Sequence, residues 1–438
     1  MELNLSVDRF LHSKRVKNTI ENDRYFIYAK KFCPRRSLDA SKLHRYLLEN
    51  NLQPVSNPRK ANLIFVYTCG GFSDYEERSI LTIEKSLENK SAKVIVTGCL
   101  PKINPKRLDE YKTTYIVSPE DLEKLDSIIQ ADFSYSECGD CSVVNGIHDL
   151  YNGSLIDRIK RHFGFNAEFL YFCANYLYKK ILPHRENDTS FSVFSNNCYK
   201  LEIARGCLGN CSYCAIKLAM PKFNSHPEEQ IVEKFKSGLK ENYRNFALIA
   251  GDIGCYGLDI NRNLPSLLNK LFAVDGDYKI LLVDLNARWF VRYYSELLLV
   301  LKANFNKVAR IIMPIQSGSN RILKLMNRHY EIDEVKKSIL NLQKNIPEII
   351  LDTHILVGFP GETDEDFRKS LNLVREIKFS SVEIYPYQDR PGTTSSNLPD
   401  KVPKDVIKRR TRILAQEVKA QKKLKQLPIN TAIEEKGV

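Results

Sequence analysis

The sequence predicts an α/β protein in which an N-terminal, doubly wound parallel sheet is followed by a partial barrel of six strand–helix units. Two observations predict this class. Short apolar runs alternate with amphipathic helical patterns, and the alternation stops near residue 130 and resumes near residue 198. Strands that alternate with helices pair in parallel through right-handed crossovers. Because 438 residues are too many for one ordinary core, two or three domains are expected.

The first unit spans residues 24–129 and follows a polar tail of residues 1–23. Helical patterns at 41–49 and 76–87 separate its strands. Ligands gather beyond the carboxyl ends of parallel strands, so we expect three cysteines that follow the strands to lie side by side. The apolar runs and their cysteines are Tyr25–Ala29 before Cys33, Leu63–Tyr67 before Cys69, and Val94–Val96 before Cys99.

Residues 130–197 break the alternation and are interpreted as a linker expanded into a mostly helical insertion. Its most apolar stretch, Phe163–Leu182, contains Glu168 and two lysines, so a membrane span is not expected there. The segment also carries Cys138 and Cys141, an isolated Cys-x-x-Cys pair. Such a pair could form half a metal site or a redox couple, but ordinary loop thiols are the favoured interpretation.

The second unit spans residues 198–400. Amphipathic patterns predict helices between its strands, and the loops that follow the strands should form the active mouth, as in complete barrels. Residues 401–438 follow, and their basic amphipathic pattern is interpreted as a helix packed on the barrel rather than an RNA-binding arm. The six candidate strands are Lys200–Ile203, Phe246–Ala250, Ile280–Asp284, Ala309–Ile315, Ile349–Leu356 and Ser381–Tyr385.

The chain is strongly basic, with 66 Lys and Arg against 53 Asp and Glu and a net charge of +13. This excess favours polyanions such as RNA through phosphate neutralisation, and a solvated basic surface is the alternative. No signal-peptide pattern follows Met1. An odd count of 11 cysteines argues against a disulfide framework. The expected location is the cytoplasm, where clustered cysteines bind metals or perform chemistry.

The sharpest signal is the Cys-x3-Cys-x2-Cys spacing of Cys207, Cys211 and Cys214, directly after a predicted strand. Three thiolates can hold three irons of a cubane cluster and leave the fourth iron open, as a catalytic metal site requires. The spacing resembles that of the radical S-adenosylmethionine (SAM) enzymes, and this resemblance implies that the open iron binds the amino and carboxylate groups of SAM, whose carbon–sulfur bond an electron then cleaves. Zinc, with Cys198 or Cys255 as fourth ligand, is the structural alternative, although zinc sites usually have paired Cys-x2-Cys arms.

This loop resembles the signature of the radical SAM superfamily, including Tyr213 before the last cysteine. The chain also resembles the methylthiotransferase family over about residues 24–125 and 199–415. The resemblance implies a radical SAM transferase that inserts a methylthio group, or sulfur, at an unactivated C–H bond. The segments that carry it are Tyr67-Thr-Cys69, Val96-Thr-Gly-Cys-Leu100, Gly251–Asp259, Met313–Arg328, Ile355–Phe367 and Arg390-Pro-Gly-Thr393.

The resemblance implies two [4Fe–4S] clusters and SAM as cofactors, together with a reducing electron donor of the flavodoxin or ferredoxin type. The catalytic cluster would be held by Cys207, Cys211 and Cys214. An auxiliary cluster, which carries the sulfur, would be held by Cys33, Cys69 and Cys99; buried structural thiols are the alternative there. Loops after the strands should supply the SAM contacts, and the candidates are Tyr213, Asp252, Gln316, Ser317 and Gly358.

The resemblance leaves the substrate open. Family substrates are tRNA adenosines near the anticodon and an aspartate of a ribosomal protein, and the positive charge makes tRNA adenosine the leading expectation. A peptide or a small molecule is the alternative, because residues 415–438 are too few for the TRAM β-barrel with which the family usually ends.

Some motifs depart from the family pattern. Phe32-Cys-Pro-Arg-Arg36 stands where a Gly-Cys with a downstream asparagine is usual, Tyr67 replaces an asparagine, and Met220-Pro-Lys222 replaces an Arg-Gly pair. These departures support a further alternative, a non-catalytic iron–sulfur or regulatory protein derived from the family.

Overall fold

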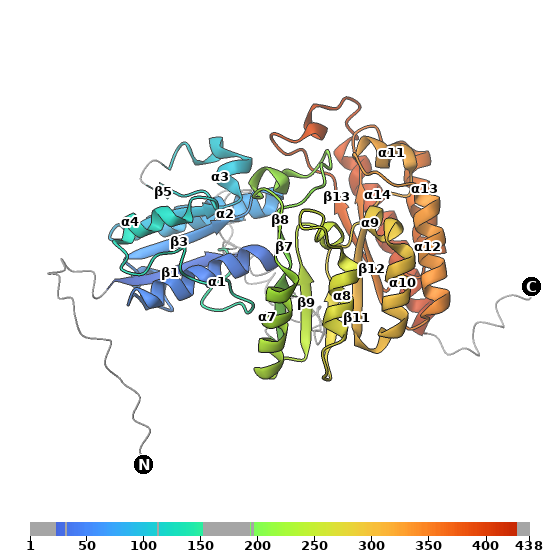
Figure 1. Ribbon diagram of the computed structural model, residues 1–438. Coiled ribbons are helices and arrows are strands. Elements are labelled where there is room, and N and C mark those ends of the chain that lie inside the picture. Colours follow the sequence, from blue (N-terminus) through green and yellow to red (C-terminus); the bar gives the residue numbers. More distant parts are fainter. Residues whose placement is uncertain (1–22, 31–32, 112–113, 152–192, 194–196, 427–438) are drawn as a thin grey trace, which may run out of the picture.

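The computed structural model describes residues 23–30, 33–111, 114–151, 193 and 197–426, in which two parallel sheets lie side by side. In Figure 1 the first sheet lies to the left in blue and the barrel lies to the right in green through red. The expected fold class is confirmed. Most of the predicted insertion, including Phe163–Leu182, lies outside the described residues, and its described part at 130–151 forms turns and bends without a helix.

The first sheet has five parallel strands in the order β2-β1-β3-β4-β5. Helix α1 (Pro34–Glu49) and α4 (Leu125–Ile129) pack on one face, and α2 (Ser73–Leu87) packs on the other. Because both faces are covered, the central strand is apolar at nearly every position. The strands are β1 (Arg24–Ala29), β2 (Gln53–Pro54), β3 (Leu63–Thr68), β4 (Lys93–Gly98) and β5 (Tyr115–Ile116).

Helix α1 begins earlier than the apolar pattern at 41–49 indicated. Pro34 occupies its first turn, where the missing N–H costs nothing, and Cys33 takes the N-cap position. The residues between Pro34 and the apolar stripe are mostly polar, so the spacing of apolar residues did not indicate the first turns of the helix. Its earlier start places Arg35 and Arg36 on the helix beside Cys33.

The second sheet has six parallel strands in the order β13-β12-β11-β10-β9-β6, so each strand lies next to its predecessor. This sequential order is that of a partial barrel with its helices outside. The main apolar core lies between strands and helices. The strands are β6 (Cys198–Glu202), β9 (Asn245–Ile249), β10 (Lys279–Leu282), β11 (Val308–Gln316), β12 (Leu351–Val357) and β13 (Ser381–Pro386).

The outer helices each present one apolar stripe to the strands. The last of them packs through Ile407 and Leu414, which are buried. Among the described residues, every helix is too short or too polar to span a lipid bilayer. The helices are α7 (Glu228–Lys240), α8 (Leu264–Phe272), α9 (Ala287–Arg292), α10 (Tyr294–Ala303), α11 (Asn320–Leu325), α12 (Ile332–Asn345), α13 (Asp364–Glu376) and α14 (Lys404–Gln426).

Candidate active site

A cavity of about 900 Å³ lies where the carboxyl ends of the two sheets meet, and six cysteines line it. The first sheet contributes the N-terminal triad, which we define as Cys33, Cys69 and Cys99. The barrel contributes the barrel triad, defined as Cys207, Cys211 and Cys214. Residues more than a hundred positions apart in the sequence therefore face the same space.

The N-terminal triad is placed by the ends of three strands. The N–H of Cys69, just after β3, donates to Ser79 Oγ at 2.8 Å, and the N–H of Cys99, just after β4, donates to the carbonyl of Thr68 at 2.9 Å. Gly98 between them has φ +93°, and a Cβ there would lie 2.4 Å from the Thr68 oxygen. Only glycine allows this approach, so Gly98 keeps the two cysteines together.

The barrel triad lies on a loop between two short antiparallel strands, β7 (Ala204–Arg205) and β8 (Asn224–Ser225). Gly209 lies inside the curve of this loop, where its N–H donates to Cys207 Sγ at 3.2 Å. A Cβ on Gly209 would lie 3.4 Å from that sulfur and 3.8 Å from the sulfur of Cys211. The absence of a side chain lets the loop curve around its thiols.

Each triad contains at least one thiol whose pKa is raised by burial. Burial raises the pKa of Cys69 to about 11, and its neighbours Cys99 and Cys33 add to the increase. Burial likewise raises the pKa of Cys207 to about 11, with Asp252 as the next cause. A metal would deprotonate such thiols on binding and relieve their repulsion.

The sulfurs of the two triads are not as close together as the ligands of a tetrahedral zinc site. Among the described residues, the group of three ligand atoms all within 4.8 Å of one another is Asp140, Glu202 and His226, and neither cysteine triad is that compact. Sulfurs bound to one tetrahedral zinc lie roughly 3.8 Å apart, given Zn–S bonds of about 2.3 Å. The fourth ligands considered for zinc are also engaged elsewhere: Cys255 donates to the Asp252 carbonyl at 3.1 Å, and Cys198 packs in an apolar cluster.

The five candidate SAM contacts fall into two groups. Tyr213, Asp252 and Gln316 line the cavity, whereas Ser317 and Gly358 do not. The carboxylate of Asp252 is buried and accepts hydrogen bonds from the N–H groups of Gly254 and Asn286 and from Nε1 of Trp289, at 2.9, 3.2 and 3.0 Å. Burial raises the pKa of Asp252 to about 6.

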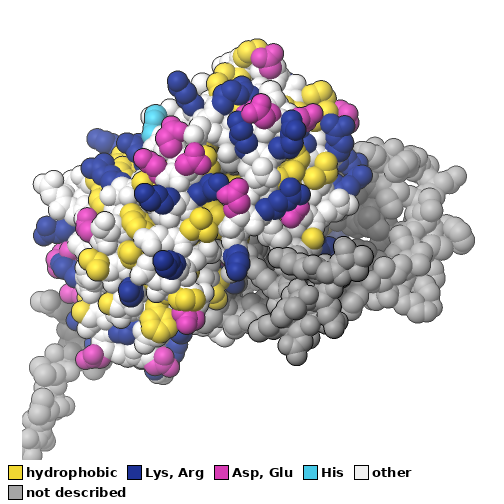
Figure 2. Space-filling view, turned by 90° about the vertical axis from the view of Figure 1, so that its right-hand side faces the viewer, with side chains coloured by type: hydrophobic (Ala, Val, Ile, Leu, Met, Phe, Trp, Pro, Cys, Tyr) yellow, Lys and Arg dark blue, Asp and Glu magenta, His cyan; other side chains and the backbone are white. Residues whose placement is uncertain are grey.

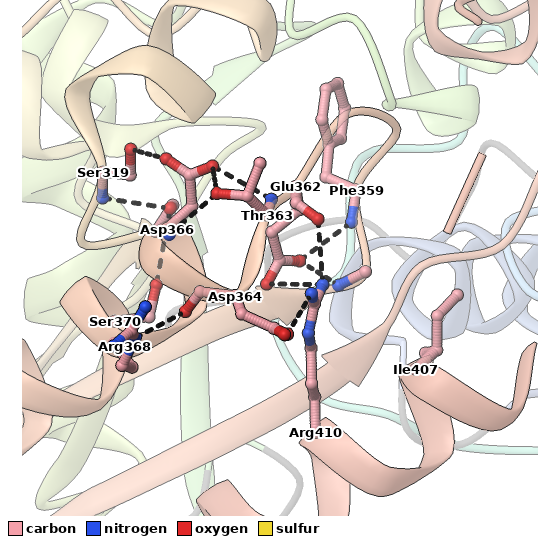
Figure 3. Close-up of polar contacts among 12 residues, drawn as sticks. Ser319, Phe359, Glu362, Thr363, Asp364, Asp366, Arg368, Ser370, Ile407 and Arg410 are labelled. Carbon is pink, nitrogen blue, oxygen red and sulfur yellow. Dashed lines mark hydrogen bonds and ion pairs between the residues drawn. The ribbon is translucent and has the colours of Figure 1, made fainter. Parts of the chain in front are cut away.

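Ser317 and Gly358 belong to the packing behind the cavity. Ser317 Oγ accepts from the N–H of Ser319 at 3.2 Å. Gly358, with φ +82°, donates its N–H to the carboxylate of Glu362, which also accepts from the N–H of Phe359 at 3.2 Å (Figure 3). Arg410 of α14 approaches the same carboxylate at 3.6 Å (Figure 3).

The turn at Gly358 contacts the cavity lining through the aromatic ring of Phe359. The Phe359 ring meets the Tyr213 ring edge-on at 6.5 Å between centroids, and Tyr213 neighbours two thiols of the barrel triad in the loop. The turn, Arg410 and α14 therefore support the cysteine loop from outside the barrel without contacting the cavity themselves.

Several cavity residues were missed by sequence reasoning. Arg328, the last residue of a matched segment, donates to Cys211 Sγ at 3.5 Å and to the Pro314 carbonyl at 2.5 Å. It thereby fixes the cysteine loop to β11. Asp284, which the sequence placed inside a strand, instead follows β10 with φ +60°, and Gln316 has φ +76°. Left-handed conformations of residues other than glycine are typical of functional sites.

A polar cluster at the barrel mouth was also missed. His354 Nε2 lies 3.5 Å from the carboxylate of Glu383, to which the Tyr385 hydroxyl also donates. Asp284 faces the same space, and although burial raises its pKa, His354 and Arg35 oppose that increase. These groups come from β12, from β13 and from the residues after β10, so no local sequence signal marks them as one cluster.

Two family models match the chain: "Radical SAM superfamily" over residues 201–374 and "Uncharacterized protein family UPF0004" over residues 27–118. A "Probable threonylcarbamoyladenosine tRNA methylthiotransferase" of Pyrococcus horikoshii is 31% identical over 87% of this chain and 81% of its own length. A "Ribosomal protein uS12 methylthiotransferase" of Geotalea uraniireducens is 29% identical over 86% of this chain and 78% of its own length.

Among solved structures, the radical SAM methyltransferase TsrM from Kitasatospora setae superimposes with a TM-score of 0.54. It is 13% identical and covers 86% of this chain and 77% of its own, which supports the fold alone. The resemblance inferred from the motifs is confirmed by the sequence relatives. The chain belongs to the radical SAM methylthiotransferase family, and it is a transferase whose cofactors are SAM and two [4Fe–4S] clusters.

Proposed function

We propose that this enzyme inserts a methylthio group into an adenosine of tRNA, with one cluster on each cysteine triad. The observation that carries the proposal is the shared cavity, into which both triads open. Sulfur insertion requires that the sulfur source and the hydrogen-abstracting radical reach the same carbon, and a common cavity meets that geometric demand. When bound, the clusters and SAM supply the electron, the sulfur, the methyl group and the radical for this replacement of C–H by C–S–CH₃.

The protein itself holds the cysteine loop in place, orients SAM and excludes water. Cys211 is held by Arg328, and the loop as a whole is supported by Phe359 through Tyr213. Asp252, fixed by three donors beside Cys207, supplies a rigid acceptor for an ammonium or hydroxyl group of SAM. The two sheets are joined by the buried pair of Glu76 and Arg390, and Arg390 itself lines the cavity.

Charge supports an RNA substrate. Figure 2 shows many Lys and Arg side chains on the barrel side of the molecule, with Asp and Glu among them. Helix α14 contributes exposed basic residues, including Lys408, Arg409 and Arg412. Phosphate neutralisation by such residues provides affinity without sequence specificity. The relative from Pyrococcus horikoshii, whose name specifies a tRNA nucleoside, points in the same direction.

Inside the cavity, Arg35 offers a cationic group to a substrate. Its Nη1 lies 3.9 Å from Met220 Sδ, and no carboxylate of the described residues lies within 4.0 Å of it. A guanidinium without an anionic partner among the described residues suits a bidentate contact to a substrate carboxylate or phosphate. A threonylcarbamoyl group carries a carboxylate, so Arg35 fits the nucleoside in the name of that relative.

The test is to compare tRNA nucleosides, by mass spectrometry after hydrolysis, from cells that lack this gene and have no second enzyme of the kind. The cells are complemented with the wild-type chain, with Cys211→Ala, or with Cys198→Ala as a control buried away from the cavity. A methylthio-adenosine is expected with the wild type and the control, and not with Cys211→Ala.

A ribosomal protein is the second candidate, because a relative named for uS12 is nearly as similar as the tRNA enzyme. The same cells distinguish the two. If the nucleosides are identical in all strains and a peptide of uS12 carries a methylthio group only with the wild type and the control, tRNA is excluded as the substrate.

A further inference from the structure

Arg36 contacts both halves of the site. Its Nε donates to Cys99 Sγ at 3.4 Å, and its Nη2 donates to the carbonyl of Ala219 at 2.7 Å. Its Nη1 pairs with Asp39 at 2.7 Å. Cys99 belongs to the N-terminal triad, whereas Ala219 ends the turn that follows Cys214 in the barrel triad. One side chain therefore joins a cysteine of the N-terminal triad to the segment that follows the barrel triad.

The guanidinium is held in a fixed position by these contacts. All three nitrogens have partners, and only 15% of the side chain is exposed. An arginine guanidinium keeps its charge in proteins, and Asp39 provides it with a carboxylate partner. A fixed, charged donor in a partly buried site acts on a thiolate more strongly than a mobile surface cation does.

The residues joined by these contacts lie far apart in the sequence. Arg36 reaches the carbonyl of Ala219, and Arg35 contacts the next residue, Met220, at 3.9 Å. The start of α1 and the segment that follows Cys214 are therefore held together by two adjacent arginines.

We infer that Arg36 is a positioning residue that raises the reduction potential of the auxiliary cluster by donating a charged hydrogen bond to the Cys99 thiolate. The inference rests on the proposed assignment of that cluster to Cys33, Cys69 and Cys99. Adding one electron makes a cluster more negative, so a nearby cation and a hydrogen bond to sulfur favour the reduced state. The Ala219 carbonyl and Asp39 keep the guanidinium aimed at the sulfur.

The test isolates the auxiliary cluster and measures its midpoint potential. In a Cys207→Ala, Cys211→Ala, Cys214→Ala background, reconstituted protein is titrated with dithionite and followed by electron paramagnetic resonance. Arg36→Gln is expected to reduce the ratio of reduced to oxidised cluster about tenfold at the parent's midpoint, which equals about 59 mV for one electron. Arg36→Lys keeps the positive charge but cannot make the three separate contacts of the guanidinium. Its midpoint potential is therefore expected to lie between those of the parent and the Arg36→Gln protein.

The chain provides a matched control on the same helix. Arg45 Nε donates to Cys138 Sγ at 3.4 Å, the same contact as in Arg36 and Cys99, but Cys138 packs in the core of the first sheet and does not line the cavity. Arg45→Gln should leave the potential unchanged. An equal shift in this control would overturn the inference, because the effect would then be one of general charge.

The remaining outcomes separate the inference from the proposal beneath it. An Arg36→Gln protein with full iron content and the parent's potential overturns the role of Arg36 alone. If the Arg36→Gln protein does not hold a cluster, the Arg36→Lys protein replaces it, and a potential equal to the parent's then overturns the role of Arg36. A triple-alanine background that binds no cluster overturns the assignment of the auxiliary site, and the inference about Arg36 with it.

Discussion

Glu76 of α2 and Arg390, which follows β13, form a buried ion pair between the first sheet and the barrel, with each side chain only 7% exposed. Asn104 donates to the same carboxylate at 3.0 Å. Nearby, the Ser73 N–H donates to the side chain of Gln388 at 2.9 Å. These contacts define how the sheets dock, and the docking encloses the cavity.

Glu76→Gln is expected to lower the free energy of unfolding by about 3 kcal/mol, because it leaves the Arg390 charge buried without its partner. Urea unfolding of the purified chain measures this. Glu88→Gln removes an exposed pair with Lys85 and should change stability by less than about 1 kcal/mol. Adding Arg390→Met to Glu76→Gln should recover part of the loss; no recovery would show that the pair itself is not the cause.

Anaerobic reconstitution should load about eight irons per chain, as two [4Fe–4S] clusters require. Cys69→Ser and Cys211→Ser should each reduce the count to about four, since each removes one of the three cysteine ligands of one cluster. Only Cys211→Ser should also abolish the formation of deoxyadenosine from SAM. Cys198→Ser serves as the control. A wild-type chain that never exceeds about four irons would contradict the two-cluster assignment.

Glu362 should make stability depend on pH. Burial raises its pKa to about 7, above the unfolded value of 4.5. The folded state therefore binds the proton more tightly, so the contribution to stability is fully present below pH 4.5 and is lost as pH rises through 7. Glu362→Gln should flatten the decline of stability between these values, as followed by thermal unfolding at several pH values. An unchanged slope would exclude this carboxyl as its source.

Charge reversal on α14 should weaken tRNA binding and its dependence on salt. Lys408→Glu with Arg412→Glu places two acids on exposed positions of the helix. If both residues bind phosphates, the slope of log K against log salt should become shallower by about 0.9 for each phosphate that is no longer neutralised. Lys236→Glu with Lys240→Glu, at the same spacing on exposed positions of α7, is the control. Equal decreases in affinity for both pairs would indicate a general charge effect.

Much of the fold and part of the site could be predicted from the sequence, for identifiable reasons. Buried parallel strands are apolar throughout, so Leu63–Thr68 stands out as a run, and a cysteine after a strand end can be placed at one edge of the sheet. Arg36 and Arg328 could not be predicted, because each reaches a sulfur far away in the sequence through a long side chain. Asp284 was missed because an aspartate in the sequence does not by itself indicate a left-handed backbone conformation.

Each sheet has an apolar core of its own, but the reaction space exists only where the two meet. The six thiols are divided three and three between the first sheet and the barrel, which share two apolar clusters, one around Cys99 and Ala215 and one in which Leu38 packs with Ala247 and Leu281. The proposed active site of this enzyme is thus composite. Either half on its own would contain three of the six thiols and would lack the common cavity in which radical and sulfur are to meet.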